Sequence, residues 1–473
     1  MGAPKVAGLD IGTTKIQMVI YDESLAPLES YIVRNETMVS GDIAEQDPLQ
    51  LMSKISGLLK KAENNGVKIV GLASYRGSLI VWDRQGRPLS NIITWMDSRA
   101  SSKYGILPLK ARIASKTPVL GAAFTPESMA VRLAVLLVEK PRLGVLLSRG
   151  KALAWNVDAY IAYRLSGRYI ADASTSALTG LVNPSNLKPL GIVEKILGLP
   201  RLEYPIMPFQ DEVELNYGGQ VIGSLLGDQQ SASIALDCLE EGCLKVSIGT
   251  GFFLDYSLGE TRRTGIRLSG GLVPIILLYT RSKRVNGVEG YLTGMGKTVE
   301  WFVENMFGGL YSKMDESITD RKPPLVVPYI WGSRTPRLSR GSSGILGLEP
   351  GYTASDIANG IAHGVAAALG YAFNVITSNY GRPKRLLVTG GLSRLNRFVK
   401  LVASYMNTPV HVPLRNDLTA LGAAYMALRS TGSPVKPFIN MKTIEPDPSL
   451  RIIQPEDLVS AARSIEGRTA GKR

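Results

Sequence analysis

The sequence predicts an α/β protein of two similar domains with a central cleft, and three observations lead to this prediction. The chain has 473 residues, more than one ordinary hydrophobic core accommodates. A Gly/Thr turn at 10–14 and another at 247–251 each separate two apolar runs. Near the N-terminus, three predicted strands, a helix and a further strand follow one another. Two turns of one design, far apart in the chain, favour two similar halves.

The composition is typical of a soluble globular protein, with 45% hydrophobic and 20% charged residues. No uncharged apolar run approaches the length that spans a bilayer, and the N-terminus lacks the pattern of a secretory signal. Cys238 and Cys243 are too few for a disulfide framework and match no zinc spacing. We therefore expect a cytoplasmic protein in a reducing compartment.

The net charge of +14 raises the question of a polyanionic partner. The basic residues are scattered, apart from short clusters at 262–263 and 281–284, and no nucleic-acid-binding motif is present. A basic surface that serves small anionic substrates is favoured, with no nucleic-acid or membrane partner. His363 and His411 lie in apolar contexts that indicate structural roles, so a His-based catalytic triad is not expected.

In the first half, an Asp47-Pro48 pair opens a predicted helix. This order of strands and helix is the opening of the ribonuclease-H-like fold that actin, Hsp70 and hexokinase share. The stretch from 106 to 200 is mainly helical, and its small polar run at 171–176 is either a surface turn or a cleft lining. We expect strands at 6–9, 16–21, 27–33, 69–73 and 79–82, helices at 129–138 and 156–165, and a linker at 201–220.

In the second half, Gly294-Met-Gly-Lys297 opens a helix whose apolar side includes Trp301 and Met306. Residues 323–340 are expected to form an irregular Pro/Arg loop, and residues beyond 434 to wrap or fray. The remaining predicted elements are strands at 272–279, 385–388 and 410–412, a long helix at 354–379, and helices after 393 and from 418. The predicted domains are 1–222 and 223–433, followed by a C-terminal tail at 434–473.

Three local patterns have the composition of a binding site. Gly-rich turns between strands bring backbone N–H groups close to a phosphate, because no Cβ blocks the approach. Trp95, Asp97 and Arg99 follow an apolar run, and an aromatic wall with charged groups suits a polyol pocket. The alternative is a core Trp beside a surface ion pair, and the local sequence does not separate the two. Asp228 follows Gly227 at the expected mouth of the cleft.

Together these motifs resemble the FGGY family of carbohydrate kinases, over nearly the whole chain and in the right order. Asp10-Ile-Gly-Thr-Thr resembles the first phosphate motif of the family, and Gly249-Thr-Gly resembles the second. Gly390-Gly391 with Asn396, followed by residues 420–424, resembles the adenosine motif of the family. Trp95-x-Asp-x-Arg and Gly227-Asp-Gln-Gln resemble its substrate motifs. Within the family, the motifs look most like those of glycerol kinase.

The chain departs from the glycerol-kinase pattern at three positions. Gly77 stands where those enzymes carry Glu, Glu127 where they carry Tyr, and Gln17 where they carry an Arg. The Met-His pair of xylulose kinases is also missing at 76–77. These departures leave the identity of the substrate open, whereas the type of reaction that the resemblance implies is unaffected.

The resemblance implies ATP and Mg²⁺ as cofactors and a role for each matching residue. Asp228 would be the general base, and Asp10 and Asp228 would hold the metal. Phosphate and nucleoside contacts would come from Thr13, Thr14, Lys15, Gly249, Thr250, Gly296, Gly390, Gly391 and Asn396. Substrate contacts would come from Arg76, Gly77, Trp95, Asp97, Glu127, Gln229 and Phe253.

The resemblance thus predicts an ATP-dependent kinase that phosphorylates a hydroxyl of a small polyol or sugar. A glycerol-like polyol and a four- or five-carbon polyol or ketose are the expected substrates. A xylulokinase-like ketose kinase, a non-kinase ATPase of the actin/Hsp70 group and a catalytically altered family member are the alternatives. For the assembly of the protein, a homodimer is the expectation.

Overall fold

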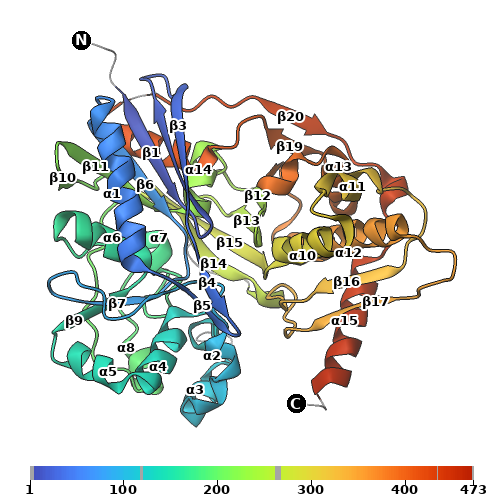
Figure 1. The fold of residues 1–473 in the computed structure, drawn as a ribbon, viewed down its shortest axis with the longest axis horizontal. Coiled ribbons are helices and arrows are strands. Elements are labelled where there is room, and N and C mark those ends of the chain that lie inside the picture. Colours follow the sequence, from blue (N-terminus) through green and yellow to red (C-terminus); the bar gives the residue numbers. More distant parts are fainter. Residues whose placement is uncertain (1–4, 118–120, 261–267, 434, 471–473) are drawn as a thin grey trace. The chain divides into compact units, whose positions relative to one another are not determined.

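The computed structural model describes residues 5–117, 121–260, 268–433 and 435–470 (Figure 1). The chain packs into two compact units, each assembled from three stretches of sequence. The first unit contains residues 1–237, 275–285 and 417–438, and the second contains 238–274, 286–416 and 439–473. The predicted domain boundaries at 222 and 433 stay predictions.

A six-stranded mixed sheet organises the first unit, in the order β10-β11-β6-β1-β2-β3. Strands β1, β2 and β3 form an antiparallel meander, whereas β1, β6 and β11 run parallel to one another. The predicted strands at the N-terminus are therefore confirmed. The bounds are β1 Val6–Ile11, β2 Lys15–Tyr21, β3 Pro27–Arg34, β6 Ile69–Ser74, β10 Leu215–Tyr217 and β11 Gln220–Gly227.

Helices cover both faces of this sheet. Helix α1 (Pro48–Asn64) begins where predicted, because the Asp47 carboxylate accepts hydrogen bonds from the N–H groups of its first turn. Helix α14 (Leu418–Arg429) lies directly on β1 and β6. A Cβ on Gly8 would lie 1.8 Å from the carbonyl oxygen of Ala420, so only glycine permits this approach.

The middle of the first unit is mainly helical, as predicted for 106–200. Two small sheets accompany the helices, one of β4, β5 and β8 and one of β7 and β9. Residues 201–220 do not serve only as a linker, because β10 pairs with β11 at the edge of the main sheet. The bounds are β4 Met38–Ser40, β5 Ile43–Gln46, β7 Ile80–Asp83, β8 Ile92–Ile93, β9 Ala152–Trp155, α2 Arg99–Ser102, α3 Leu109–Ala114, α4 Met129–Glu139, α5 Pro141–Ser148, α6 Val157–Ser166, α7 Ala173–Ser176 and α8 Gly191–Leu197.

The second unit repeats the strand arrangement of the first. The seven-stranded sheet has the order β14-β15-β13-β12-β18-β19-β20, in which β12 is antiparallel to β13 and parallel to β18. Most of β14 belongs to the stretch 275–285 of the first unit, and the strands from β13 to β20 in this order belong to the second. Strand β1 has the same two relationships, with β2 and β6. The bounds are β12 Cys243–Ile248, β13 Phe252–Ser257, β14 Val273–Tyr279, β15 Arg284–Leu292, β18 Arg385–Thr389, β19 Val410–Pro413 and β20 Met441–Ile444.

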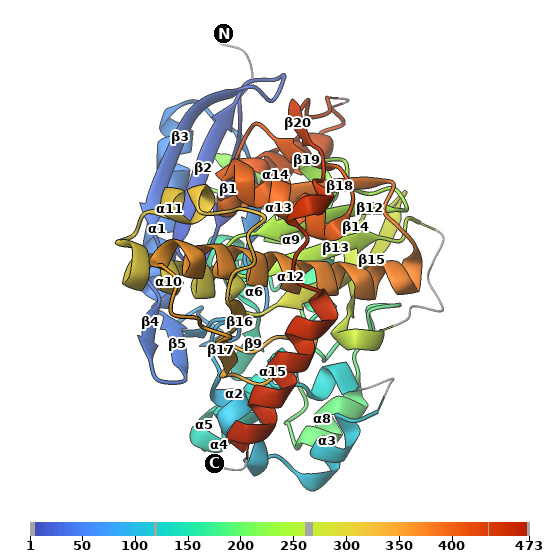
Figure 2. The ribbon, with the colours of Figure 1, turned by 90° about the vertical axis from the view of Figure 1, so that its right-hand side faces the viewer.

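The long helix α12 (Ala354–Tyr380) packs against α13 (Asn396–Met406) and α15 (Pro455–Ala470) in the second unit (Figure 2). His363 of α12 is buried, and its ring nitrogens face the Tyr405 hydroxyl and the Thr319 carbonyl at 3.0 Å, as expected for a structural His. Burial lowers the pKa of His363 to about 4.

Three expectations for the second half are wrong. Trp301 and Met306 of α10 (Met295–Phe307) are 49% and 37% exposed, because the buried side of this helix is formed by neighbouring residues such as Phe302. Residues 325–329 of the expected loop form β16, which pairs with β17 (Ser342–Leu346). The tail beyond 434 contributes β20 to the sheet and ends in α15.

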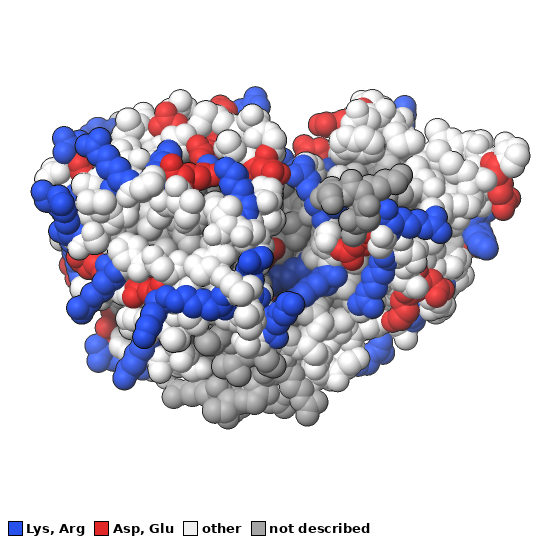
Figure 3. All heavy atoms as spheres, turned by 90° about the horizontal axis from the view of Figure 1, so that it is seen from below, with Lys and Arg blue, Asp and Glu red and all other residues white. Residues whose placement is uncertain are grey.

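Two helical stretches, Gly121–Glu139 and Ala354–Tyr380, are long and apolar enough to cross a membrane. Both are mostly buried inside the structure, as core helices are. Lys and Arg side chains are spread over the face shown in Figure 3 and interspersed with Asp and Glu. This distribution agrees with the scattered basic residues in the sequence.

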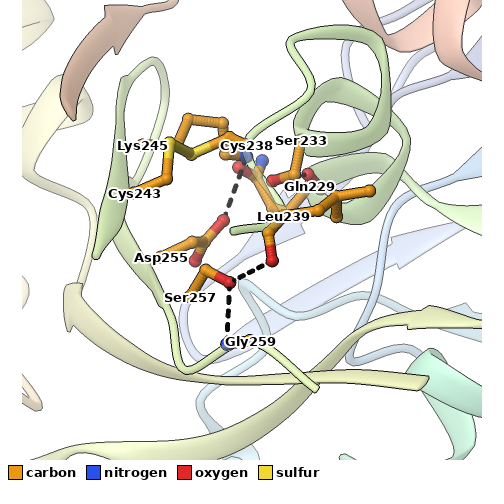
Figure 4. Close-up of a disulfide and its surroundings, with 9 residues drawn as sticks. All are labelled: Gln229, Ser233, Cys238, Leu239, Cys243, Lys245, Asp255, Ser257 and Gly259. Carbon is orange, nitrogen blue, oxygen red and sulfur yellow. Dashed lines mark hydrogen bonds and ion pairs between the residues drawn. A yellow bond between two sulfur atoms is a disulfide. The ribbon is translucent and has the colours of Figure 1, made fainter. Parts of the chain in front are cut away.

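The two cysteines, from which no disulfide framework is expected, form one disulfide. It joins Cys238, in the segment after α9 (Asp228–Ala235), to Cys243 at the start of β12 (Figure 4). Nearby, the Lys245 ammonium lies 3.0 Å from the Asp255 carboxylate, and both side chains are almost fully buried. This end of the second sheet therefore has a covalent bridge and a buried ion pair.

Candidate active site

Three parallel strands of the first unit end at one edge of the sheet and carry the predicted catalytic residues. In the register, Asp10 of β1 and Leu226 of β11 both lie opposite Ala73 of β6. Asp228 begins helix α9 directly after β11, and Arg76 follows β6. The structure therefore brings Asp10, Arg76 and Asp228 together, as expected for a site at the carboxyl ends of parallel strands.

The two acids influence each other electrostatically. Burial and the negative charge of Asp228 raise the pKa of Asp10 from 3.8 to about 7, and the charge of Lys15 opposes this shift. The Arg76 Nε lies 3.5 Å from the Asp228 Oδ1. A Cβ on Gly227 would lie 3.0 Å from the Arg76 Cδ, so the glycine before Asp228 gives the buried arginine its space.

These two carboxylates suit a hard divalent cation. Their mutual repulsion is relieved when a cation lies between them, and Mg²⁺ uses few carboxylates together with water and phosphate oxygens. Within the described ranges, no group of three or more His, Cys, Asp or Glu side chains forms a metal site. The donor set thus fits a metal that takes its other ligands from water and a nucleotide.

The turn between β1 and β2 is held by side chains from other elements. Asn35 donates to the Gly12 carbonyl at 2.8 Å, and Gln46 donates to the Thr13 carbonyl at 2.8 Å. Thr13 is buried, whereas Thr14 and Lys15 are exposed. The Lys15 ammonium contacts the Gln17 amide oxygen at 3.1 Å, so the residue that replaces the expected Arg engages this lysine.

The predicted substrate loops of the first unit lie side by side. Gly77 has φ +67°, a left-handed conformation that favours glycine, and a Cβ on it would lie 3.3 Å from the Trp95 Cβ. Arg132 of α4 donates to the carbonyl oxygens of Gly77, Thr94 and Trp95. Arg132 could not be predicted as part of this site, because a single Arg within an apolar helical run gives no sign of these long-range contacts.

Asp97 lies in a buried network with Arg99. Its carboxylate accepts hydrogen bonds from the Ala44 N–H at 2.9 Å and from the Arg99 Nε at 3.0 Å, and Arg99 also pairs with Glu45 at 2.6 Å. This geometry matches the ion-pair alternative for the motif, although the pair is buried and not on the surface. A role for Asp97 toward substrate hydroxyls stays a prediction.

The other two substrate candidates of the first unit are more open. Gln229 is partly exposed in the first turn of α9, next to Asp228. Glu127 is exposed in the turn before α4. Their substrate contacts stay predictions.

In the second unit, four of the predicted nucleotide residues converge. A Cβ on Gly296 would lie 1.7 Å from the Gly249 carbonyl oxygen, so the start of α10 rests on the turn between β12 and β13. The Lys297 N–H donates to the Thr250 carbonyl at 3.3 Å. A Cβ on Gly390, at the end of β18, would lie 2.7 Å from the Ile248 carbonyl group. Gly249, Thr250, Gly296 and Gly390 therefore form one backbone cluster.

The remaining candidates of the second unit lie around this cluster. Phe253 stacks on Tyr291, with ring centroids 4.6 Å apart. Gly391 is exposed at the turn after β18, and Asn396 is exposed at the start of α13. The Asn396 amide oxygen accepts a hydrogen bond from Lys442 of β20 at 3.2 Å.

A duplicated mixed sheet, with acids at the strand ends of one unit and a glycine cluster in the other, defines the two-domain actin/hexokinase-like fold class. The N-terminal domain of the FGGY family of carbohydrate kinases matches residues 6–225, and its C-terminal domain matches residues 244–431. The chain belongs to this family and is an ATP-dependent kinase of a sugar or polyol. The predicted fold class and family resemblance are confirmed, and the non-kinase ATPase alternative is set aside.

Relatives and solved structures agree with this assignment. A glycerol kinase from Gloeobacter violaceus is 28% identical over 449 residues, covering 90% of this chain and 88% of its own. A protein described as an uncharacterized sugar kinase from Archaeoglobus fulgidus is 25% identical over 462 residues, covering 91% and 92%. The fold is shared with Plasmodium falciparum glycerol kinase with ADP (20% identity, TM-score 0.81, covering 100% of this chain and 98% of that one). It is also shared with ligand-bound xylulose kinase from Lactobacillus acidophilus (18% identity, TM-score 0.82, covering 99% and 98%).

Proposed function

We propose that this kinase phosphorylates a hydroxyl of a small polyol or ketose, with Asp228 as the general base. The observation that carries the proposal is the meeting of Asp10, Arg76 and Asp228 at one sheet edge. Asp228 would take the proton of the attacking hydroxyl, which requires an approach of about 3 Å. The Arg76 guanidinium, 3.5 Å from Asp228, orients this carboxylate and leaves it accessible at the start of α9.

Asp10 and Asp228 would hold Mg²⁺, which supplies charge neutralisation on the transferring phosphoryl group when bound. The N–H and hydroxyl groups of Thr13, Thr14, Gly249 and Thr250 would bind the β- and γ-phosphates, with Lys15 adding charge. Gly296, Gly390, Gly391 and Asn396 would line the nucleoside end. Phosphoryl transfer depends mainly on such positioning and charge neutralisation, so these contacts account for most of the proposed catalysis.

The size of the substrate follows from the loop at Gly77. A glycerol-kinase pattern has a carboxylate at this position, and its removal takes away a partner for hydroxyls. The remaining polar groups of the first unit are Arg76 and Gln229, and Trp95 would supply an apolar wall. This favours a four- or five-carbon polyol or ketose over glycerol, since a hydroxyl without its partner costs about 1–3 kcal/mol. Glycerol is the second candidate, because relatives named glycerol kinase align with nearly the whole chain.

The test is a screen of ATP consumption over glycerol, tetritols, pentitols, ketoses and aldoses. We expect the largest kcat/KM for a C4 or C5 compound, and a clear preference for glycerol would contradict the proposed longer substrate. The Asp228→Asn variant should keep ATP binding and lose about 10²-fold or more of its turnover on the best substrate. Asp320→Asn, at an exposed position of the second unit, is the matched control. Near-full activity of Asp228→Asn would contradict the proposal that Asp228 is the general base.

A cytoplasmic location and a homodimer complete the proposal. The relatives are metabolic kinases by name, and the scattered surface charge fits a small anionic cosubstrate such as ATP. Light scattering coupled to gel filtration measures the assembly directly, and a monomer across the working concentration range would contradict the dimer.

A further inference from the structure

Arg132 joins two loops that carry the proposed substrate residues. It lies in α4, and its side chain is 4% exposed. Its Nη1 donates to the carbonyl oxygens of Gly77 and, at 3.1 Å, of Thr94, while its Nη2 donates to the Trp95 carbonyl at 3.0 Å. Gly77 belongs to the loop between β6 and β7, and Thr94 and Trp95 belong to the segment after β8. One guanidinium thus binds the backbone of both loops.

These bonds extend a connection that the backbone begins. Leu79 and Ile93 exchange two backbone hydrogen bonds, of 2.9 and 2.8 Å, which fix the two loops at one point. Beyond this pair the loops lead to Arg76 on one side and to Trp95 on the other. The left-handed Gly77 faces Trp95 closely, since a Cβ on Gly77 would lie only 3.3 Å from the Trp95 Cβ. Arg132 adds side-chain hydrogen bonds to both loops over this last part.

The chemistry at this position requires a guanidinium. A planar group with five donors in a fixed fork serves three carbonyl oxygens at once, which the compact ammonium of a lysine cannot do in the same geometry. Arg132 also lines a small cavity with Asp97, Arg99 and Glu139. Both carboxylates on this cavity pair with Arg99, at 3.0 and 3.7 Å, and compensate the buried charge of that arginine.

We propose that Arg132 is a positioning residue that sets the spacing between Arg76 and Trp95, and thereby the size of the polyol or sugar that the enzyme accepts. This inference rests on the proposed function of those two side chains. Arg132 acts through the backbone of the loops and has no role in nucleotide binding, which depends on the glycine cluster of the second unit and the turn after β1.

The experiment compares Arg132→Met and Arg132→Lys with the native enzyme on its best substrate and on the homologues one carbon shorter and longer. Arg132→Met removes all the donors and keeps a long side chain. We expect its KM for the substrate to rise about 10-fold or more, its preference among the homologues to weaken, and its KM for ATP to stay within about twofold. The substrate KM of Arg132→Lys, which keeps the charge, should lie between that of the native enzyme and that of Arg132→Met.

Leu133→Ala is the matched control, because Leu133 is the adjacent buried residue of α4. It should lower the melting temperature without a selective change in substrate KM. An unchanged substrate KM in Arg132→Met, an equal rise in both KM values, or the same selective change in Leu133→Ala would overturn the proposal.

Hydrogen exchange separates this inference from the proposed function. In the absence of any substrate, amides of 75–79 and 93–97 should exchange faster in Arg132→Met than in Leu133→Ala. Unchanged exchange there overturns the positioning role whatever the substrate is. If the native enzyme phosphorylates no compound of the screen, the proposed substrate class fails, while faster exchange still supports the anchoring of the two loops by Arg132.

Discussion

Asp158 and Asp172 form a buried acid pair that the catalytic proposal does not use. The Asp158 carboxylate accepts hydrogen bonds from the Asp172 N–H at 2.9 Å and the Thr175 hydroxyl at 2.8 Å, and the Asp172 carboxylate accepts one from Gln210 at 2.7 Å. Burial and the charge of Asp172 raise the pKa of Asp158 from 3.8 to about 6. The run 171–176 is therefore neither a surface turn nor an open lining, because its residues are almost fully buried.

This pair predicts how stability depends on pH. A carboxyl group with a raised pKa in the folded state stabilises the fold fully below 3.8, and this contribution is lost as the pH rises through about 6. Asp158→Asn mimics the protonated form, so it should gain stability relative to the native protein between pH 4 and 7. The gain is about 3 kcal/mol at most, since one pKa unit corresponds to about 1.4 kcal/mol.

Urea unfolding at pH 4, 5.5 and 7.5 measures this difference, with Asp320→Asn as the control for a generic change of charge. A free-energy difference between Asp158→Asn and the native protein that does not vary with pH would contradict the assignment.

At the scale of elements, glycines determine where backbone meets backbone. Gly296 lets α10 rest on the turn at Gly249, and a Cβ there would lie 1.7 Å from the Gly249 carbonyl oxygen. Gly296→Ala must therefore displace either the helix or the turn. If this turn binds the nucleotide phosphates, the KM for ATP should rise about 10-fold or more, while the KM for the phosphoryl acceptor changes little.

Steady-state kinetics on folded, purified protein measure this effect. Gly57→Ala is the control, because Gly57 lies in α1 with open space around its Cβ position. That substitution should be neutral or stabilise the helix by up to about 1 kcal/mol. An unchanged KM for ATP in Gly296→Ala would show that the turn does not hold the nucleotide.

Elements with strong periodic patterns could be predicted from the sequence, and so could the site residues that lie within local motifs. The meander of β1 to β3, the start of α1 after Asp47, and Asp228 after Gly227 all follow from short-range patterns, whereas helix α9 itself was not predicted. Strand β16 could not be predicted, because Pro and Arg residues surround it in the sequence. Among the described residues, it belongs to a two-stranded sheet with β17. Trp301 follows the helical period of α10 but lies on its open side.

Long-range contacts account for what the sequence analysis missed at the site. Asp97 binds the backbone of Ala44, and Arg132 binds carbonyl groups, each more than 30 residues away. Neither partner is marked by spacing or composition, because a backbone carbonyl belongs to every residue. The sequence motif therefore shows where the substrate loops are, while the fold determines which side chains form hydrogen bonds with these loops.

At the scale of the whole molecule, the two units have separate hydrophobic cores. Every buried residue of one core, from Ala7 to Leu225, belongs to the first unit, and every residue of the other, from Leu244 to Ala462, belongs to the second. A domain with its own core has its own stability. The chain passes between the units several times, so the two stabilities are linked by connectivity even though the cores are distinct.

Separate cores predict that thermal unfolding is not a single two-state transition. Calorimetry should resolve two components, and a calorimetric enthalpy equal to the van't Hoff enthalpy would contradict this. ADP at about 100 times its Kd should add about 2.7 kcal/mol of stability, mostly to the unit that holds the glycine cluster, because the proposed nucleoside contacts lie there and only phosphate contacts lie at Thr13 and Thr14. Gly8→Ala assigns the other component, because its Cβ would meet the carbonyl oxygen of Ala420 at 1.8 Å inside the first unit. It should lower only the component that ADP raises less, whereas a shared shift of both components would show that the two cores unfold as one.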